Sequence, residues 1–402
     1  MGIETTVGTF CPFIYGKGLP AGSRNSFGTI PVYGSNGIVG WHDVPYTKGP
    51  TVVIGRKGTV GAVHYSPIPC WPIDTTFFIE YSDPQDARFT YYLLKTLGLE
   101  LMNSDSAVPG LNRDAAHLRK IPLFDKTYRH AISQILGVLD EKIEVNRQIC
   151  KTLEGTAQAI FKSWFVDFDP VLAKAAGKQP EGMNPEIAAL FPDSFEDSET
   201  GPIPKWWKFS PCLKHLSIIS GGTPKTTRHE LWDGNIPWYS IGDAPPEHGV
   251  FVLKTEKSIS QAGLESSSTR LLPVGTTIIS ARGTVGKLAL TGVPMTMNQS
   301  CYGLVSISET PFWSYLTIAD AVDTLKQRTH GSVFDTITRE TFNNLSVIDP
   351  GNCLKQVFEG IVSPLMMAIC NNVAMSHSLV SIRDFLLPKL ISGKIRINDA
   401  ES

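Results

Sequence analysis

The chain has 402 residues, a net charge of −2, and 42% hydrophobic against 18% charged residues. This composition excludes a disordered chain and is typical of a protein with two or three globular domains. No run of about 18 apolar residues occurs, which predicts no transmembrane helix. The seven cysteines include no CxxC pair. We therefore expect reduced thiols in the cytoplasm rather than a zinc site or a disulfide framework.

Charge is spread unevenly along the chain. Residues 1–128 carry eleven basic and ten acidic side chains, and residues 201–350 carry thirteen and twelve. Residues 167–200 carry two basic and eight acidic side chains, so the acidity gathers in one segment. None of these regions is strongly basic. Any DNA binding must therefore be local, or must use positive charge from a partner.

Residues 1–128 are predicted to form the first domain. Apolar runs at 52–54 and 76–79, broken by glycine and proline, indicate short strands, and residues 87–101 indicate a helix. Strands gathered before a helix predict an α+β domain rather than a βαβ array.

Residues 129–166 are predicted to form one long helix, because they contain no proline and keep heptad spacing. Its a and d positions are Leu136, Leu139, Ile143, Cys150, Leu153, Ala157, Ile160 and Trp164. Residues 167–204 then hold six prolines and many acids. They predict an acidic, proline-rich linker with at most one helical turn, around residues 185–190.

The second half of the chain repeats the first. Gly58-Thr59-Val60-Gly61 recurs 225 residues later as Gly283-Thr284-Val285-Gly286, and Ile30-Pro31-Val32-Tyr33 is answered by Ile236-Pro237-Trp238-Tyr239. Matches in the same order at nearly one offset indicate a duplication. We therefore expect a second domain at 205–350, with strands at 276–280 and 303–307 and a helix at 311–327. A second helix should follow at 351–392, and a tail at 393–402.

The second helix keeps the heptad pattern at an offset of 226. Its core positions are Val362, Leu365, Ile369, Ser376, Leu379, Arg383, Leu386 and Leu390. Pro364 and Pro388 predict a start or kink near the first and fraying near the second. Asn146 and Asn372 occupy the same heptad core position in the two helices. A buried asparagine there fixes the register of paired helices at a cost in stability. The alternative is a pair of bundle helices with polar breaks.

An antiparallel pair of such helices would place two recognition domains about an approximate two-fold axis. A helix of about 37 residues is roughly 55 Å long, and DNA half-sites one duplex turn apart are about 34–36 Å apart. This geometry fits two readers of a bipartite DNA site, with the helices as the spacer. Because the two domains differ outside their shared motifs, the half-sites should differ too.

The chain resembles the specificity subunit of Type I restriction–modification enzymes over essentially its full length. The first half carries the resemblance in residues 30–37, 54–61, 71–76 and 110–113, and the second in residues 219–224, 236–238 and 335–339. The helix ends match as well, at 161–165 and 387–393. The resemblance implies two target-recognition domains joined by an antiparallel coiled coil. It also implies double-stranded DNA, two methyltransferase subunits and translocase–nuclease subunits as partners.

One departure from an even repeat is that the second domain opens on Pro204-Lys205-Trp206-Trp207, a lead that the first domain lacks. The edge of the first domain is therefore open to completion by another part of the chain, such as the C-terminal tail.

Candidate DNA-binding residues lie in polar, glycine-rich loops and turns. In the first domain they are Lys17, Arg24, Tyr33, Ser35, Asn36, Arg56, Lys57 and Arg113. In the second domain they are Thr223, Lys225, Thr226, Arg228, Trp238, Ser240, Arg282, Lys287, Asn298, Gln299 and Arg339. Cations and amides of this kind contact phosphates or base edges. Each residue also has a structural explanation. The cations could be solvated side chains beside a tight glycine turn, and the aromatic residues could belong to the core. The amides could form hydrogen bonds at strand ends, and Arg113 and Arg339 could cap helices.

The sequence predicts a subunit without catalysis of its own. It lacks a GxxxxGK[ST] phosphate loop, because Gly283-Thr284-Val285-Gly286-Lys287 has the wrong spacing. No nuclease-like or methyltransferase-like run stands out, the nine histidines show no ligand spacing, and we expect no cofactor or metal. Two alternatives stay open: a nucleotide-binding enzyme that uses the repeated glycine loops, and a DNA-independent scaffold.

Overall fold

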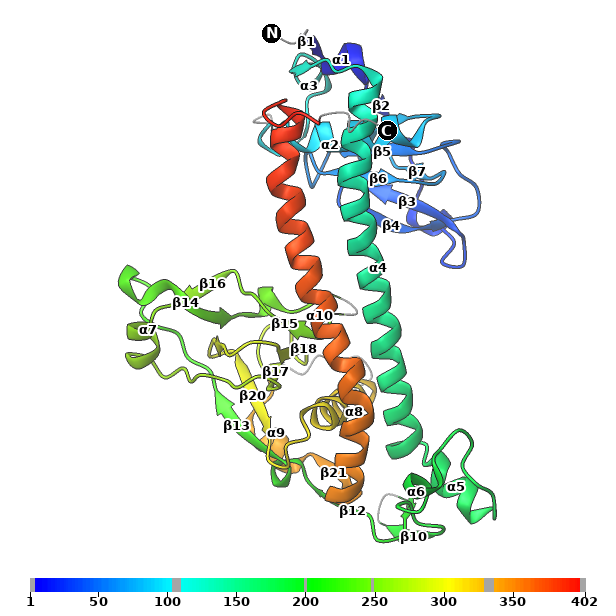
Figure 1. The fold of residues 1–402 in the computed structure, drawn as a ribbon, viewed down its shortest axis with the longest axis vertical. Coiled ribbons are helices and arrows are strands. Elements are labelled where there is room, and N and C mark those ends of the chain that lie inside the picture. The colour runs from blue at the N-terminus through cyan, green and yellow to red at the C-terminus, as the bar shows by residue number, and fades with distance from the viewer. Residues whose placement is uncertain (1–3, 103–109, 199–200, 247–248, 329–335, 398–402) are drawn as a thin grey trace. The chain divides into compact units, whose positions relative to one another are not determined.

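The computed structural model describes residues 4–102, 110–198, 201–246, 249–328 and 336–397. The chain forms two compact units (Figure 1). Unit 1 contains Met1–Ile143 together with Ser378–Ser402, and unit 2 contains Glu144–His377. Each unit therefore includes one end of each long helix.

Unit 1 is an α+β domain, as predicted, and has two main sheets. The four-stranded sheet has the order β2 (Ile14–Tyr15), β8 (Thr76–Glu80), β5 (Thr51–Gly55), β6 (Val63–Ser66). The three-stranded sheet has the order β4 (Gly37–His42), β3 (Ile30–Gly34), β7 (Trp71–Pro72), in which β3 and β7 are parallel. A third, two-stranded sheet pairs β1 (Glu4–Thr6) with β9 (Lys120–Pro122). Strand β5 is buried along its whole length, as its apolar run predicted.

The helix of unit 1 is shorter than expected. α2 runs over Pro84–Lys95 and is followed by a separate 3-10 turn, η2, at Leu99–Leu101. Asp83 caps its N-terminus by accepting from Gln85 N, and proline occupies the first turn. The helix stops because Gly98 adopts a left-handed backbone conformation, with φ 64°. Three short helical segments complete the unit: α1 (Val7–Phe10), η1 (Ala21–Ser23) and α3 (Arg113–His117).

Unit 2 repeats this plan. Its larger sheet has the order β13 (Leu216–Ser220), β20 (Cys301–Ser306), β17 (Thr277–Ser280), β18 (Leu288–Thr291), β15 (Phe251–Val252). Its smaller sheet has the order β16 (Lys257–Ile259), β14 (Trp232–Tyr239), β19 (Thr296–Met297), and β14 and β19 are parallel like β3 and β7. β12 (Lys208–Pro211) pairs with β21 (Ser346–Asp349) as β1 pairs with β9. The helices are α7 (Gln261–Glu265), α8 (Pro311–Arg328) and α9 (Arg339–Asn344), with 3-10 turns η3 (Cys212–Lys214), η4 (His229–Leu231) and η5 (Ile241–Asp243).

The acidic, proline-rich segment between the halves is folded. It contains α5 (Asp169–Ala175), α6 (Pro185–Ala188) and a hairpin of β10 (Phe195–Ser198) and β11 (Gly201–Pro204). Its prolines are compatible with this fold because Pro170 and Pro185 occupy first-turn positions of helices. Val171, Phe191 and Trp207 anchor the segment in the core of unit 2. We call residues 166–207 the linker subdomain.

Two helices of 40 residues each continue from one unit into the other, α4 (Lys126–Phe165) and α10 (Asn352–Ile391). In unit 1 they run antiparallel, because Tyr128 OH donates to Ile395 O at 3.0 Å and Arg383 pairs with Asp140 at 2.7 Å. In unit 2 they also run antiparallel, because Cys150 lies beside Ile369 and Phe161 packs on Phe358. The expected antiparallel pairing is therefore present in each unit.

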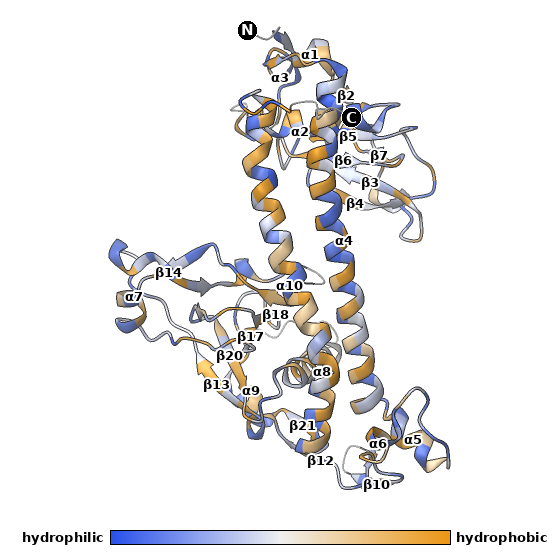
Figure 2. Cartoon of the chain, in the orientation of Figure 1, coloured by the Kyte–Doolittle hydropathy of each residue, from blue (hydrophilic) through white to orange (hydrophobic). Residues whose placement is uncertain are grey.

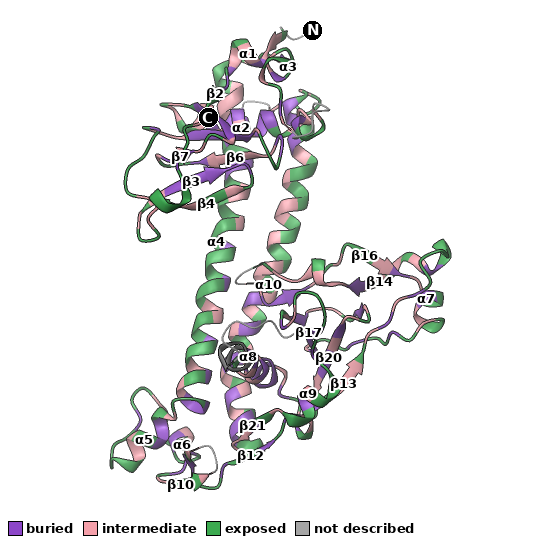
Figure 3. Ribbon diagram, turned by 180° about the vertical axis from the view of Figure 1, so that it is seen from behind, coloured by how far each residue is buried: buried purple, intermediate pink, exposed green. Residues whose placement is uncertain are grey.

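Each domain core is closed by the far end of the other domain's helix. In unit 1, Ile132 and Leu136 of α4 share a core with Leu387, Leu390 and Ile391 of α10. In unit 2 the residues 226 positions away take the same places. They are Phe358 and Val362 of α10, with Phe161, Trp164 and Phe165 of α4. The buried faces of both helices are visible in Figure 3. The C-terminal segment thus completes the first domain.

The bounds of α10 agree with the expected range of 351–392, but its two prolines do not mark its ends. It begins at Asn352, twelve residues before Pro364, and Phe358 and Val362 are fully buried in its first turns. It also continues past Pro388 to Ile391, where Leu390 and Ile391 enter the unit 1 core. Among the described residues α10 is the one helix long and apolar enough to cross a membrane, but a single helix of this kind is weak evidence for a membrane span. Polar residues interrupt its apolar surface (Figure 2), and it packs on α4 in both units.

Candidate nucleic-acid interface

The repeated glycine motif forms the same tight turn in both units. Gly58 and Gly61 have φ values of 80° and 74°, and Gly283 and Gly286 have 78° and 79°. In unit 1, Gly61 N donates to Gly55 O at 2.8 Å, and a Cβ on Gly61 would lie 2.3 Å from Glu100 N. Positive φ and close backbone contact both require glycine here. The glycines are explained by the turn itself, without a bound phosphate.

This turn presents a cluster of cations in unit 1. Arg56 and Arg113 each place their guanidinium carbon 5.1 Å from the ring centre of Tyr15. Leu111 N donates to Arg56 O at 2.9 Å, which holds the turn against the segment that carries Arg113. Lys57 on the same turn is exposed. We call Arg56, Lys57 and Arg113 basic corner 1.

Unit 2 builds the equivalent cluster on the equivalent turn. Ile337 N donates to Ala281 O at 2.9 Å, the counterpart of the bond from Leu111 to Arg56. Arg339 reaches the end of β13, where its Nη2 lies 3.4 Å from Ser220 Oγ. The exposed cations of this cluster in unit 2 are Arg282, Lys287 and Arg339, which we call basic corner 2. The two corners share a scaffold but present different side chains.

A second shared feature is a loop held by an indole. In unit 1, Trp71 Nε1 donates to Lys17 O at 2.8 Å, and Lys17 Nζ lies 5.7 Å from the Trp71 ring centre. In unit 2, Trp238 Nε1 donates to Gly222 O at 2.9 Å. The two tryptophans come from different strands, β7 and β14, so the same role is filled from different sequence positions.

Several candidates in unit 1 are buried or form hydrogen bonds within the domain. Tyr33 and Ser35 are each 7% exposed, and Ser35 Oγ donates to Thr75 O at 2.7 Å. Burial raises the pKa of Tyr33. The guanidinium of Arg24 donates hydrogen bonds to the backbone oxygens of Val39 and Leu19, at 3.0 and 3.3 Å. These residues support the loops, whereas Lys17 and Asn36 are exposed on them.

Candidates in unit 2 divide in the same way. Trp238 is 7% exposed. Ser240 Oγ donates to Asp243 at 2.9 Å, and Asn298 Oδ1 accepts from Ser300 N at 3.0 Å, so both serve local structure. Thr223 is half-buried and donates to Gln299. The exposed candidates of these loops are Lys225, Thr226, Arg228 and Gln299, of which Arg228 forms an ion pair with Glu230 at 2.7 Å.

Two exposed aromatic residues beside the candidate loops were not among the predicted DNA-binding residues. Tyr15 stacks with two arginines of basic corner 1, and Phe27 is 93% exposed on the loop after Arg24. No motif marked either residue. Tyr15 becomes recognisable only once the segment around residue 110 is folded back onto the glycine turn.

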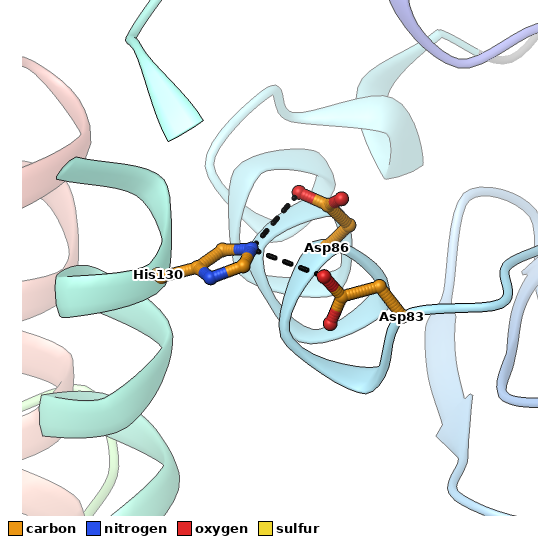
Figure 4. A group of neighbouring side chains, drawn as sticks. All are labelled: Asp83, Asp86 and His130. Carbon is orange, nitrogen blue, oxygen red and sulfur yellow. Dashed lines mark ion pairs between the residues drawn. The ribbon is translucent and has the colours of Figure 1, made fainter. Parts of the chain in front are cut away.

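One group among the described residues has the composition of a metal site (Figure 4). His130 Nε2 lies 3.4 Å from Asp83 Oδ2 and 3.4 Å from Asp86 Oδ1. However, Lys126 Nζ lies 3.2 Å from the same Asp83 oxygen, and Arg129 lies 3.5 Å from the same Asp86 oxygen. Two cations thus already neutralise the two carboxylates. The group is best described as an ion-pair joint between the start of α2 and the start of α4.

The fold and its two basic corners define a class: tandem α+β recognition domains, each followed by one of two antiparallel helices. A family model for the Type I restriction modification DNA specificity domain matches residues 4–155 and 205–351. The chain belongs to this family, whose members recognise DNA sequence as specificity subunits of Type I restriction–modification systems.

Similar proteins agree with this membership. The specificity subunit of the Type I restriction enzyme HindI from Haemophilus influenzae is 28% identical over 329 residues, 71% of each chain. The specificity subunit of the Type I restriction enzyme MjaIX from Methanocaldococcus jannaschii is 27% identical over 160 residues. The match covers 39% of this chain and 37% of the relative. The crystal structure of a Type I S subunit from M. genitalium shares the fold. Its TM-score is 0.62 at 16% identity, covering 97% of this chain and 96% of that one.

Proposed function

We propose that this chain reads a bipartite, asymmetric DNA site and directs methyltransferase and restriction subunits to it, without catalysis of its own. The observation that carries the proposal is the basic corner built twice, on the same glycine turn, in two domains of a duplicated fold. Cations on a rigid turn suit phosphate contacts, which position a protein on the duplex. The exposed loops beside each corner would then contact base edges.

The asymmetry of the site follows from the differences between the two corners. Basic corner 1 stacks on Tyr15, whereas Arg339 in basic corner 2 reaches Ser220. The neighbouring loop presents Lys17 in unit 1 and Lys225, Thr226 and Arg228 in unit 2. Different donors in equivalent places should read different sequences. The DNA contacts that we propose are therefore Lys17, Asn36, Arg56, Lys57, Arg113, Lys225, Thr226, Arg228, Arg282, Lys287, Gln299 and Arg339.

The partner subunits are assigned to the outer faces of the long helices. α4 exposes Ile135, Val138, Val145 and Ile149, which recur at heptad spacing on one face. α10 exposes a second apolar set: Met367, Met375, Ile382 and Phe385. A solvent-exposed apolar stripe on a helix is typical of a surface that packs against a partner's helices. We infer that two methyltransferase subunits bind here, that restriction subunits join them, and that the assembly works in the cytoplasm.

An exchange of recognition domains tests the proposal. Residues 205–350 are replaced by the corresponding domain of another specificity subunit, and the chain is expressed with its own methyltransferase subunits. Mapping of methylated bases in the host genome should show one half-site changed and the other retained. A change in both half-sites would contradict independent reading, and methylation without sequence preference would contradict the proposed function itself.

The open alternatives have their own measurements. A nucleotide-binding enzyme predicts that the isolated chain binds ATP or S-adenosylmethionine in a calorimetric titration. The glycine turns give no support to it, because their positive φ values and close contacts already account for the glycines. A DNA-independent scaffold predicts that the assembled complex shows no preference for any DNA sequence.

A further inference from the structure

Arg228 lies in the loop between β13 and β14, on a backbone that is fixed on both sides of it. The loop is exposed from Lys225 to Glu230. Before the arginine, Lys225 O accepts hydrogen bonds from Arg228 N at 3.1 Å and from Trp232 Nε1 at 3.3 Å. After the arginine, Glu230 O accepts from Ser260 Oγ at 2.8 Å. The loop therefore presents the Arg228 side chain from a preformed backbone.

The guanidinium of Arg228 is held through one of its three nitrogens. Its Nε donates to Glu230 Oε1 at 2.7 Å, and this hydrogen bond lowers the pKa of Glu230 below its usual value. Within the described part of the chain, the terminal nitrogens Nη1 and Nη2 have no hydrogen-bond partner. The two side chains are 54% and 60% exposed. So exposed an ion pair adds little to stability, but it does orient the free end of the guanidinium.

Unit 1 contains the same arginine in the opposite arrangement. Arg24 follows Pro20 by four residues, as Arg228 follows Pro224. Each of these arginines donates its backbone N–H to the residue three positions earlier, at 3.2 and 3.1 Å. However, Arg24 donates both terminal nitrogens to backbone oxygens of its own domain. The carboxylate two residues later is replaced by a serine in unit 1. The nitrogens that unit 1 uses internally are thus free in unit 2.

The arginines of the basic corners are arranged differently from Arg228. Arg56 and Arg339 each use a terminal nitrogen within their own domain. Arg113 is paired through Nε, but at 3.5 Å, and its guanidinium lies against the ring of Tyr15. Clustered positive charge suits phosphate contacts. The ion pair on the unit 2 loop has no net charge, so it attracts phosphates weakly while it still offers two parallel donors.

The loop lies close enough to basic corner 2 for both to contact one half-site. Arg339 of that corner reaches Ser220, with 3.4 Å between Nη2 and Oγ. Ser220 and Lys225 are five residues apart, so they are separated by at most about 18 Å. One duplex turn is about 34 Å long. The corner can therefore hold a phosphate while the loop contacts a nearby base.

We propose that Arg228 reads one guanine of the half-site bound by unit 2, and that Glu230 is its positioning residue. Nη1 and Nη2 donate in parallel to O6 and N7 of guanine in the major groove, an arrangement that distinguishes guanine from the other bases. Because the guanidinium is already oriented, less side-chain freedom is lost on binding. The inference rests on the proposed function and adds the identity of one base and its reader.

The first test measures the assembled complex on duplexes that carry each base pair in turn at every position of the unit 2 half-site. Arg228→Ala should lower affinity for the preferred site about 10- to 100-fold and abolish the preference at one G·C pair. The slope of log K against log salt should not change, because no phosphate contact is lost. Arg339→Ala is the matched control. It should weaken all sequences about equally and reduce that slope by about 1.

A chemical probe tests the contact to the base itself. Replacing that guanine with 7-deazaguanine removes the N7 acceptor that Arg228 is proposed to use. Affinity of the parent complex should fall about 10-fold, as expected for one lost hydrogen bond to a charged donor. Affinity of the Arg228→Ala complex should not change. An equal fall in both complexes would overturn the proposed contact.

Variants of Glu230 test its positioning role. Glu230→Ala should reduce the preference for guanine while it raises affinity for non-specific DNA, because it removes an acid from beside the phosphates. Glu230→Gln keeps an acceptor oxygen and should retain most of the preference. A purely structural role would instead lower both affinities together with the melting temperature. Full preference for guanine in Glu230→Ala would overturn the assignment of Glu230.

The remaining outcomes separate this inference from the proposed function. Preference for every base pair surviving in Arg228→Ala overturns the inference, and so does a unit 2 half-site without a G·C pair. A uniform loss of affinity with a salt slope reduced by about 1 also overturns it, because that result marks a phosphate contact. In each of these cases the complex still recognises a bipartite site. A parent complex without any sequence preference refutes the proposed function itself.

Discussion

Asn146 donates a hydrogen bond from its side-chain nitrogen to Ser376 Oγ, at 3.3 Å, between the paired helices of unit 2. Asn146 is fully buried, and its side-chain oxygen has no hydrogen-bond partner among the described residues. Asn372, at the equivalent position of α10, instead donates to Ala368 O of its own helix at 2.8 Å. Of the two asparagines expected to fix the register, only Asn146 makes a polar contact across the pair.

Replacing Asn146 with leucine should therefore stabilise the chain while loosening the register. Removing a buried, unsatisfied oxygen should raise the free energy of unfolding by about 1–3 kcal/mol. Spin labels at positions 145 and 375, both exposed, should report one narrow distance in the parent chain and a broader distribution in Asn146→Leu. Asn372→Leu is the matched control and should keep the narrow distribution. A narrow distribution in both variants would show that apolar packing alone sets the register.

The glycine turn offers a pair of substitutions that separates the cost of its backbone conformation from the cost of close backbone contact. Gly58 and Gly61 have nearly the same φ, but a Cβ on Gly58 meets open space, whereas one on Gly61 meets backbone atoms at 2.3 Å. Gly58→Ala should cost about 1–2 kcal/mol from its backbone conformation alone. Gly61→Ala should cost clearly more, as judged from urea denaturation. The backbone atoms that a Cβ on Gly61 would meet belong to Leu99 and Glu100 of η2. Equal costs would therefore mean that the turn can move away from η2.

The joint between α10 and the second domain predicts a specific pH dependence. Burial acts to raise the pKa of Asp349, but hydrogen bonds from Lys355 and Gly351 N outweigh it and lower that pKa below its usual value of 3.8. Lys355 is 1% exposed, lies 3.0 Å from Asp349, and also contacts His215 and the Trp313 ring. Ionised Asp349 therefore stabilises the fold at neutral pH. That contribution is lost as the pH falls below about 3.8, through the lowered pKa.

Asp349→Asn should accordingly lower stability at pH 7 by about 3–5 kcal/mol, because it leaves a buried ammonium without its carboxylate. The gap in melting temperature from the parent chain should shrink as the pH falls from 5 to 3. The double variant Asp349→Asn, Lys355→Met should recover much of the loss at pH 7. A gap that does not change with pH would mean that the carboxylate is not charged in the fold.

The two basic corners predict how DNA affinity depends on salt. Removing one phosphate contact should reduce the slope of log K against log salt by about 1. We expect this from Arg113→Ala and from Arg339→Ala, measured with the assembled complex. Arg24→Ala is the control. It should lower thermal stability and leave the slope unchanged, because Arg24 bonds to backbone oxygens. If an arginine instead reads a base, its loss should relax sequence preference in one half-site only.

The sequence was most informative where a pattern repeats and least where packing joins distant segments. The offset of 226 correctly related Leu136 to Val362 and Trp164 to Leu390, because both helices obey the same heptad geometry. The fold of residues 167–204 was missed, because its prolines and acids hid the few aromatics that anchor it, such as Phe191. The indole of Trp238 taking the role of Trp71 was equally hidden, because different strands deliver the two rings to the same place.

The spacer role of the helices predicts the result of a heptad insertion. Seven residues added to α4 within positions 136–160, with a matching heptad added to the facing part of α10, lengthen each helix by about 10.5 Å and preserve the a/d seam. At about 3.4 Å per base pair, the spacer between the half-sites should grow by about three base pairs. Methylation mapping should show both half-site sequences retained. Insertion of three residues is the control, because it rotates the apolar faces apart and should abolish assembly. An unchanged spacer after the heptad insertion would mean that another part of the complex sets the distance.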